Sequence, residues 1–247
     1  MARAAPPAER PAFYALASGG WRDLVTLLHP PYTAWHLSYV AIGAAMAPRL
    51  HATRLLEALL AFLLAVGVAA HALDELQGRP LRTRLSDRTL VLLASVALAG
   101  AVAIGIYAAV STSLTLLPFV AVGVFLVLAY DLEWFGGRFH NDFWFAAAWG
   151  AFPAAAGYWV NALTVRAPGV LAVAACFALS VAQRRLSTPV RELRRRTVSV
   201  SGEQRLRDGS VIALDATALA APLDGALRAC ALAITLLAVA LVVLRLE

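Results

Sequence analysis

Apolar runs long enough to cross a membrane recur along this chain, and they constrain its fold more than any other feature. A helix needs about 20 apolar residues to cross the hydrocarbon core of a bilayer. Of the 247 residues, 61% are hydrophobic and only 15% are charged, unlike the composition of soluble domains. Backbone polar groups cannot stay unpaired in lipid, so the runs are predicted to be helical. The sequence thus predicts an all-α, polytopic transmembrane helix bundle.

Seven spans are predicted, together with a helix that precedes them. The spans are 33–48, 55–74, 88–110, 114–130, 142–160, 167–186 and 224–245. The stretch Trp21–His29 has apolar residues on one helical face and is predicted to lie in the membrane interface. It is expected to stop at Pro30-Pro31, because proline breaks a helix beyond its first turn. The expected organisation is an N-terminal segment 1–32, six spans within 33–186, a loop 187–223 and a last span within 224–247.

The arginines orient the predicted bundle. All 21 basic residues are arginines, and a cytoplasmic N-terminus puts 17 of them on the cytoplasmic side. Such a bias is typical of loops that stay inside the cell. We therefore expect a multi-pass protein of the cell (inner) membrane whose polar loops 71–88, 131–142 and 184–223 share the cytoplasmic face. Arginines beside spans indicate contact with membrane lipids, and no nucleic-acid partner is expected.

The longest of these loops carries a hairpin signal. Asp208-Gly209 separates Glu203–Arg207 from Ser210–Leu214. Asp-Gly between two such runs is typical of a β-hairpin with a two-residue turn. We expect a small β-hairpin that lies over the cytoplasmic mouth of the bundle.

The run from His71 to Leu81 holds the first candidate site. His71, Asp74 and Glu75 follow an apolar stretch that only Glu57 interrupts, and their spacing puts them on one helical face. Ionisable groups beside a span are costly and usually functional. Two carboxylates there suit Mg²⁺, which keeps waters and binds substrate phosphates; with a histidine they also suit a transition metal. Alternatively, His71, Asp74 and Glu75 lie at a solvated helix end, where the two acids pair with Arg79, Arg82 or Arg84.

The junction between the fourth and fifth spans holds the second candidate site. Its polar residues are Asp131, Glu133, His140, Asn141 and Asp142. Asp131 and Glu133 would diverge on a helix but could converge in a loop, where they would bind substrate or metal. Asp142 is alternatively a helix N-cap.

A third candidate lies on the sixth span and its extension. Arg184, Arg191 and Arg195 would share one face if the helix continues past Pro189. Guanidinium groups bind phosphate, and they equally bind anionic lipid headgroups; we favour the lipid interpretation for this cluster as a whole. The sequence has no Walker-type or dinucleotide glycine loop, no HExxH and no GxSxG.

These motifs together resemble the UbiA superfamily of intramembrane prenyltransferases. Leu28–His36 looks like that family's Arg-Pro segment before the first span, and His71–Thr83 resembles its first Asp-rich motif with the Arg-Pro-Leu tail. Tyr130–Asp142 resembles the junction of its fourth and fifth helices. The family's second Asp-rich motif is missing, since Glu192 is the only acid in Gln183–Glu192.

The resemblance implies an all-helical enzyme that uses Mg²⁺ to ionise a prenyl diphosphate and transfers or cyclises the prenyl group. It would place Mg²⁺ on Asp74 and Glu75, helped by Asp131 or Asp142, with His71 near the family's motif asparagine. Arg79 would contact the diphosphate, and substrate contacts are also expected from Arg82, Asp131, Glu133, His140, Asn141 and Arg184. The acceptor would be lipid-like or aromatic.

Two other functions stay open at this stage. One is a non-catalytic protein on the same scaffold that binds a lipid or quinone or serves as a partner subunit, which the missing second motif favours. The other is a metal enzyme that uses His71, Asp74, Glu75 and His140.

Overall fold

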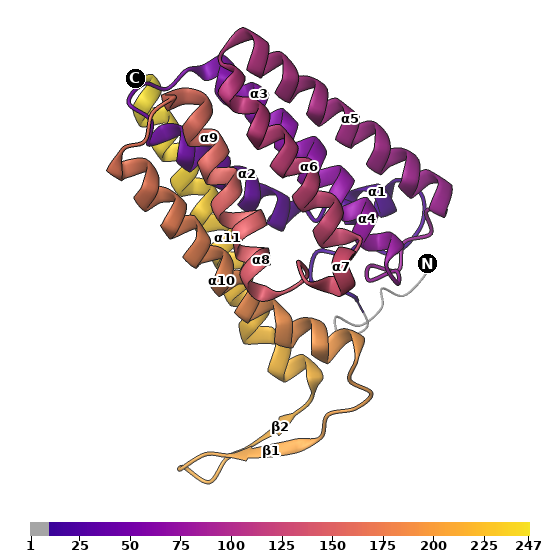
Figure 1. Ribbon diagram of the computed structural model, residues 1–247. Helices are drawn as coiled ribbons and strands as arrows, with labels where there is room; N and C mark the ends of the chain where they lie inside the picture. Colours follow the sequence, from indigo (N-terminus) through magenta and orange to yellow (C-terminus); the bar gives the residue numbers. More distant parts are fainter. Residues whose placement is uncertain (1–9) are drawn as a thin grey trace.

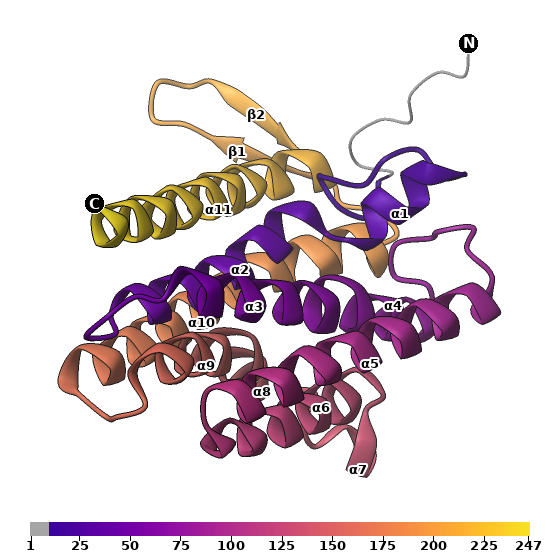
Figure 2. The ribbon, with the colours of Figure 1, turned by 90° about the horizontal axis from the view of Figure 1, so that it is seen from above.

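A short and almost completely buried helix, α2 (Pro30–Ala45), runs through the middle of the protein in the computed structural model, which describes residues 10–247. Eleven of its 16 residues are buried, as expected of a helix that is apolar on all sides. It packs against α3 (Ala52–Phe62), α9 (Phe152–Ala162) and α11 (Ala216–Leu246). The other helices surround it, with α5 (Asp87–Ser111) and α11 on opposite sides (Figures 1 and 2).

Five helices within residues 10–247 are long and apolar enough to cross a membrane. They are the continuous helix α3–η2–α4 (Ala52–Leu76), α5 (Asp87–Ser111), η3–α6 (Leu114–Asp131), α10 (Ala167–Arg195) and α11 (Ala216–Leu246). Within them, η2 is Leu63–Ala70, α4 is His71–Leu76, η3 is Leu114–Leu116 and α6 is Leu117–Asp131. Five of the seven predicted spans are therefore confirmed as span-like helices. The protein is a mostly helical, multi-pass membrane protein.

The other two predicted spans form helices that lack this combination of length and apolarity. The first is α2, whose 16 residues extend only about 24 Å, less than the hydrocarbon thickness of a bilayer. It starts at Pro30 instead of residue 33, because a proline fits the first turn of a helix. The second is the continuous helix α8–η4–α9, made of Asp142–Ala146, Ala147–Ala151 and Phe152–Ala162. Both helices belong to the interior of the bundle.

The helices α10 and α11 extend well past the predicted spans. α10 continues through Pro189 to Arg195, and α11 begins at Ala216 instead of residue 224. The buried ion pair between Arg194 and Asp224 joins the two extensions. The connection between the helices is therefore 196–215, shorter than the predicted loop 187–223.

The predicted hairpin is confirmed, with a longer turn than expected. β1 (Gly202–Arg205) pairs antiparallel with β2 (Val211–Leu214) and projects from one end of the bundle (Figure 1). The register leaves three residues in the turn, because Leu206 N–H donates to Ser210 O. Gly209 has φ +88° at the third turn position, the left-handed residue that such a loop requires.

Two short helices complete the hairpin end of the bundle. α1 (Trp21–Leu27) confirms the helix predicted before the first span, and its Trp21 and Leu24 are exposed. Its buried Asp23 accepts a hydrogen bond from Arg84 N at 3.0 Å, which ties α1 to the loop after α4. α7 (Trp134–Gly137) lies between α6 and α8. The predicted segment 1–32 also includes residues 1–9, which lie outside the described part of the chain.

Glycines bring α2 and α9 into backbone contact. A Cβ atom on Gly43 would overlap the backbone of Ala154, and one on Gly157 would overlap the backbone of Val40. Small residues allow this close approach between helices in a membrane. Gly150 meets α10 at Cys176 and Ser180 in the same way.

Replacement of Gly157 by alanine should therefore weaken the fold. We expect Gly157→Ala to lower the free energy of unfolding by about 2 kcal/mol or more, as overpacking does. The matched control is Gly225→Ala in α11, where a Cβ atom meets nothing within 4 Å; it should raise stability by about 0.5–1 kcal/mol. Thermal unfolding in detergent measures both. Equal stability of the two variants would contradict the backbone contact.

Candidate functional site

A polar cavity of about 420 Å³ lies at the hairpin end of the bundle. Its walls come from α2, η2–α4, the end of α6, the loop before α8, α8–η4, the second half of α10, the first part of α11 and the segment before α1. Charged and polar residues line it from all of these parts except α8–η4, which contributes Phe145 and Trp149. The lining includes Tyr14, His29, His36, His71, Asp74, Tyr130, Asp131, His140, Arg184, Arg191, Arg194, Arg195 and Asp224.

Two carboxylates from neighbouring helices line this cavity. Asp74 belongs to α4, and Asp131 is the last residue of α6, which packs against α4. The structure thus brings the first two candidate sites of the sequence together. The Asp131 side chain is buried, and its Oδ2 has no hydrogen-bond partner among the described residues. A buried carboxylate oxygen without a hydrogen bond costs free energy, and a ligand in the cavity that bonds to this oxygen would remove that cost.

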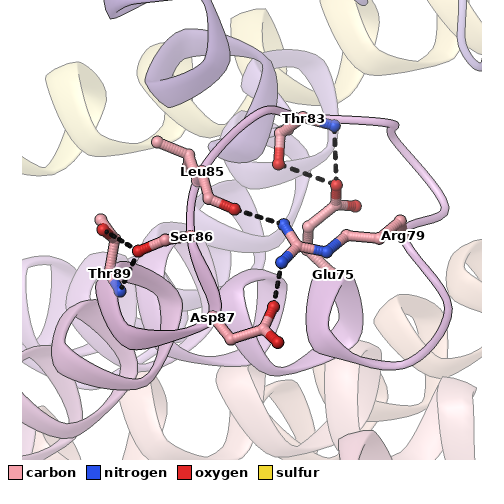
Figure 3. Close-up of polar contacts among 7 residues, drawn as sticks. All are labelled: Glu75, Arg79, Thr83, Leu85, Ser86, Asp87 and Thr89. Carbon is pink, nitrogen blue, oxygen red and sulfur yellow. Dashed lines mark hydrogen bonds and ion pairs between the residues drawn. The ribbon is translucent and has the colours of Figure 1, made fainter.

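Glu75 has a structural position instead of a place in the cavity wall. Its Oε2 accepts a hydrogen bond from Leu81 N at 2.9 Å, and its Oε1 accepts from Thr83 N and Thr83 Oγ1, both at 2.8 Å. Figure 3 shows this carboxylate beneath the loop that follows α4. The side chain is fully buried. Glu75 therefore holds the loop, and it does not line the cavity with Asp74.

Arg79 and Arg82 also lie outside the cavity lining. Arg79 donates to Leu85 O at 2.6 Å and forms an ion pair with Asp87 at the start of α5 (Figure 3). Arg82 is exposed. This geometry does not agree with the expected contact of Arg79 and Arg82 with a diphosphate. Arg79 instead connects the loop to α5.

The residues of the second candidate site divide between the cavity and the surface. His140 lines the cavity, stacks on Tyr130 at 4.5 Å and has its Nδ1 3.0 Å from Tyr130 O. Asn141, not Asp142, is the N-cap of α8, since its Oδ1 accepts from Trp144 N. Asp142 instead pairs with Arg184 at 2.8 Å, and Glu133 is exposed.

The expected metal set Asp74, Glu75 and Asp142 is therefore not brought together. Within residues 10–247, no group of three or more His, Cys, Asp or Glu residues could hold a metal ion. The pair Asp74 and Asp131 remains in the cavity. A pair of carboxylates suits Mg²⁺, because this ion completes its shell with waters and substrate phosphates.

Arginines of α10 line the wall beside these carboxylates. Because α10 continues through Pro189, Arg184, Arg191 and Arg195 share one face, and all three line the cavity. Arg195 Nε is buried and has no hydrogen-bond partner within residues 10–247, and Arg184 lies over the Phe145 ring at 5.1 Å. The sequence pattern favours membrane lipid headgroups as the ligands of this cluster as a whole. The inward orientation of Arg184, Arg191 and Arg195 instead favours an anionic ligand in the cavity.

Four of the five histidines line the same cavity. His29 and His71 stack with ring centroids 3.9 Å apart, and the Nδ1 atoms of His36 and His71 bond to the carbonyls of Trp149 and Gly67. A carbonyl only accepts, so these two rings carry hydrogen on Nδ1. The sequence reasoning missed His29 and His36. Their spacing of seven residues, which puts them on one helical face, was the available signal.

The N-cap of α2 is both strained and desolvated. His29 adopts the left-handed conformation with φ +46°, which is uncommon for a residue other than glycine. Burial, and then the neighbouring His71, lower the pKa of His29 well below its usual range, while burial raises the pKa of Tyr14. The two side chains are neutral partners, with Tyr14 Oη 2.8 Å from His29 Nδ1. This contact holds the segment before α1 against the cavity.

Searches for similar proteins returned no match among models of protein families, among curated proteins or among solved structures.

A structural role for Glu75 has a direct consequence for stability. Glu75→Ala leaves three loop donors without their acceptor, and we expect it to lower the free energy of unfolding by about 3 kcal/mol. Glu203→Ala, which removes an exposed partner of Arg205 in β1, should change stability by less than about 1 kcal/mol. Chemical denaturation of both variants measures the difference. An unchanged stability of Glu75→Ala would contradict the role in the loop.

Acidification should destabilise the protein in part through His29. Its pKa is lowered in the folded state, so the unfolded chain binds more protons as the pH falls below about 6.5, and stability drops there. Above this pH the contribution is fully present. His29→Asn, which tolerates the left-handed conformation, should show a smaller loss of melting temperature between pH 7.5 and pH 5. The same loss in both proteins would contradict the buried, neutral state of His29.

Proposed function

We propose that this protein is a membrane enzyme that binds a prenyl diphosphate in the polar cavity and transfers or cyclises its prenyl group with the help of Mg²⁺. The observation that carries the proposal is the convergence of two helix-end carboxylates, Asp74 and Asp131, on one cavity with Arg184, Arg191 and Arg195. Cations on one wall and carboxylates on the other suit a ligand that is itself anionic and binds a divalent cation.

The arginines would hold the diphosphate oxygens. Guanidinium groups form paired, charge-assisted hydrogen bonds to phosphate. Arg184 is kept in place by Asp142, and Arg195 has a buried Nε that no group in the described part of the chain bonds. These charges would stabilise negative charge as it develops on the leaving diphosphate.

Asp74 and Asp131 fit Mg²⁺ in its usual mode with phosphate ligands. The ion is commonly bound by one or two carboxylates, and waters and substrate oxygens complete the shell. The unpartnered Oδ2 of Asp131 is consistent with this role. When bound, Mg²⁺ would supply electrostatic stabilisation of the diphosphate. The site would also have to orient the substrate and exclude water. The aromatic side chains of Tyr130, Phe145 and Trp149, which line the cavity, suit both tasks.

The proposal revises the roles that the UbiA resemblance implied. Asp74 keeps its place as a metal ligand, whereas Asp131 replaces Glu75 as the second carboxylate. The arginines in the second half of α10, which contains the position of the missing second Asp-rich motif (Gln183–Glu192), replace Arg79 and Arg82 as the diphosphate contacts. We further propose that the cavity end faces the cytoplasm, in line with the arginine bias, and that α2 and α8–η4–α9 complete a seven-helix bundle.

A second candidate function is the binding of a phosphorylated lipid without catalysis. Its support is the absence, within residues 10–247, of any cluster of three or more metal-binding side chains. In that case the arginines would still bind the headgroup.

Release of diphosphate by the purified protein tests the enzyme. With Mg²⁺ and a panel of prenyl diphosphates, we expect release that Asp74→Asn and Asp131→Asn each lower by about 100-fold or more. Glu203→Gln in the exposed hairpin is the control and should leave the rate unchanged. Retained binding without release in the unmodified protein would favour the second candidate. Normal release in both aspartate variants would contradict the proposed site.

A further inference from the structure

A second polar pocket, of about 320 Å³, lies between the segment before α1 and the first part of α11. It borders the polar cavity, because Phe13, Arg194 and Asp224 line both spaces. Its wall on α11 includes a stripe of exposed residues, which are Thr217, Ala221, Gly225 and Arg228. We call this pocket the outer groove.

The outer groove has an excess of positive charge. Its charged lining residues are Arg10, Arg194, Asp224 and Arg228. Asp224 forms the buried ion pair with Arg194, so the charges of Arg10 and Arg228 exceed the acidic charge of the groove. Guanidinium groups gathered in one pocket suit an anionic ligand, and phosphate in particular.

Two of these arginines are not fully paired within the described part of the chain. Arg228 forms no ion pair with any residue in 10–247, and its Cζ lies 4.8 Å from the centre of the Phe13 ring. The Arg194 side chain is only 8% exposed, and its Nε has no hydrogen-bond partner among the same residues. A phosphate oxygen in the groove would supply an acceptor for charge-assisted hydrogen bonds.

Arg228 lies where the polar part of α11 meets its apolar part. Residues 229–244 carry no charge and extend about 24 Å along the helix, and Arg245 follows them. Arginines near the ends of a span reach the headgroup region of the bilayer. The outer groove therefore lies at the level of the lipid headgroups.

The exposed stripe of the groove continues along the apolar part of α11. Its residues recur every three or four positions, and the same spacing leads on to the exposed Leu232, Leu236, Val239 and Val243. This spacing keeps all of them on one helical face, whereas α11 packs against α2 and α10 through its buried residues. A ligand with its head in the groove would extend apolar chains along this face. The continuity favours a lipid over a soluble anion.

We propose that the outer groove binds the headgroup of an anionic phospholipid, whose acyl chains lie along the exposed face of α11. Basic pockets at the ends of spans bind such headgroups. The site is separate from that of the cavity ligand, since Arg10 and Arg228 do not line the polar cavity, and it does not depend on the proposed function. A lipid in the groove would contact both the segment before α1 and α11, so it would stabilise the folded protein.

Two substitutions alter the groove without changing a lining residue of the polar cavity. Arg228→Gln removes the charge of an exposed side chain. Gly225→Leu fills the groove while its arginines stay, and a Cβ atom at Gly225 meets nothing within 4 Å. The matched control is Arg88→Gln. Arg88 is an exposed arginine at the start of α5, is followed by the exposed Val91 and Leu92, and does not line the groove.

Native mass spectrometry in detergent tests the proposal, because it counts the lipids that each variant retains. The probes are phosphatidylglycerol, which is anionic, and zwitterionic phosphatidylcholine with the same acyl chains. The unmodified protein and Arg88→Gln should bind one phosphatidylglycerol about tenfold or more tightly than phosphatidylcholine, because hydrogen bonds to charged groups are strong. Arg228→Gln and Gly225→Leu should both lose this preference. Inorganic phosphate, which lacks acyl chains, should raise the melting temperature less than phosphatidylglycerol at the same concentration.

Three results would overturn the proposal. The first is a preference for phosphatidylglycerol that either groove variant keeps. The second is loss of the preference in Arg88→Gln as well, which would indicate a general effect of charge. The third is equal stabilisation by inorganic phosphate, which would assign the groove to a soluble anion. The thermal transition of each variant in lipid-free detergent establishes that the variant is folded.

Discussion

The backbone contact between α2 and α9 is the constraint on which the rest of the structure depends. Gly43 and Gly157 allow the two helices to approach until there is no room for a side chain between them. This contact holds α2 in the centre of the bundle. It also brings His36 within hydrogen-bonding distance of Trp149 O, so the position of the cavity wall at Trp149 follows from the packing of small residues.

The adjacent acids Asp74 and Glu75, at the end of the first long helix, have different roles. Asp74 lines the cavity, whereas Glu75 is turned into the loop and satisfies three of its donors. Helix geometry explains the difference, because successive residues point about 100° apart. The loop in turn connects α4 to α5 through Arg79 and Asp87. The polar run is therefore a wall of the cavity and a structural connection at the same time.

Much of the fold could be predicted from local sequence. Apolar length located five span-like helices, and Asp208-Gly209 located the hairpin. The ends of α10 and α11 could not be predicted from local sequence. Their extensions are polar and become helical through contact with each other, and Arg194 of α10 pairs with Asp224 of α11. The central position of α2 in the bundle could not be predicted either, since a short apolar run has the same sequence pattern whether lipid or other helices cover it.

The sequence by itself determined the helical, multi-pass character of the protein. The hydrophobic effect places long apolar runs in lipid, and their backbone groups must then form hydrogen bonds within a helix. It also identified Asp74, Asp131 and Arg184 as polar residues at the ends of predicted spans. Only the tertiary structure decided which of the polar residues share a cavity. Asp74 and Asp131 are 57 positions apart and meet because α4 packs on α6, and Arg191 and Arg195 join them because α10 stays helical through Pro189. Such convergence depends on how helices pack, and local spacing along the chain carries no information about it.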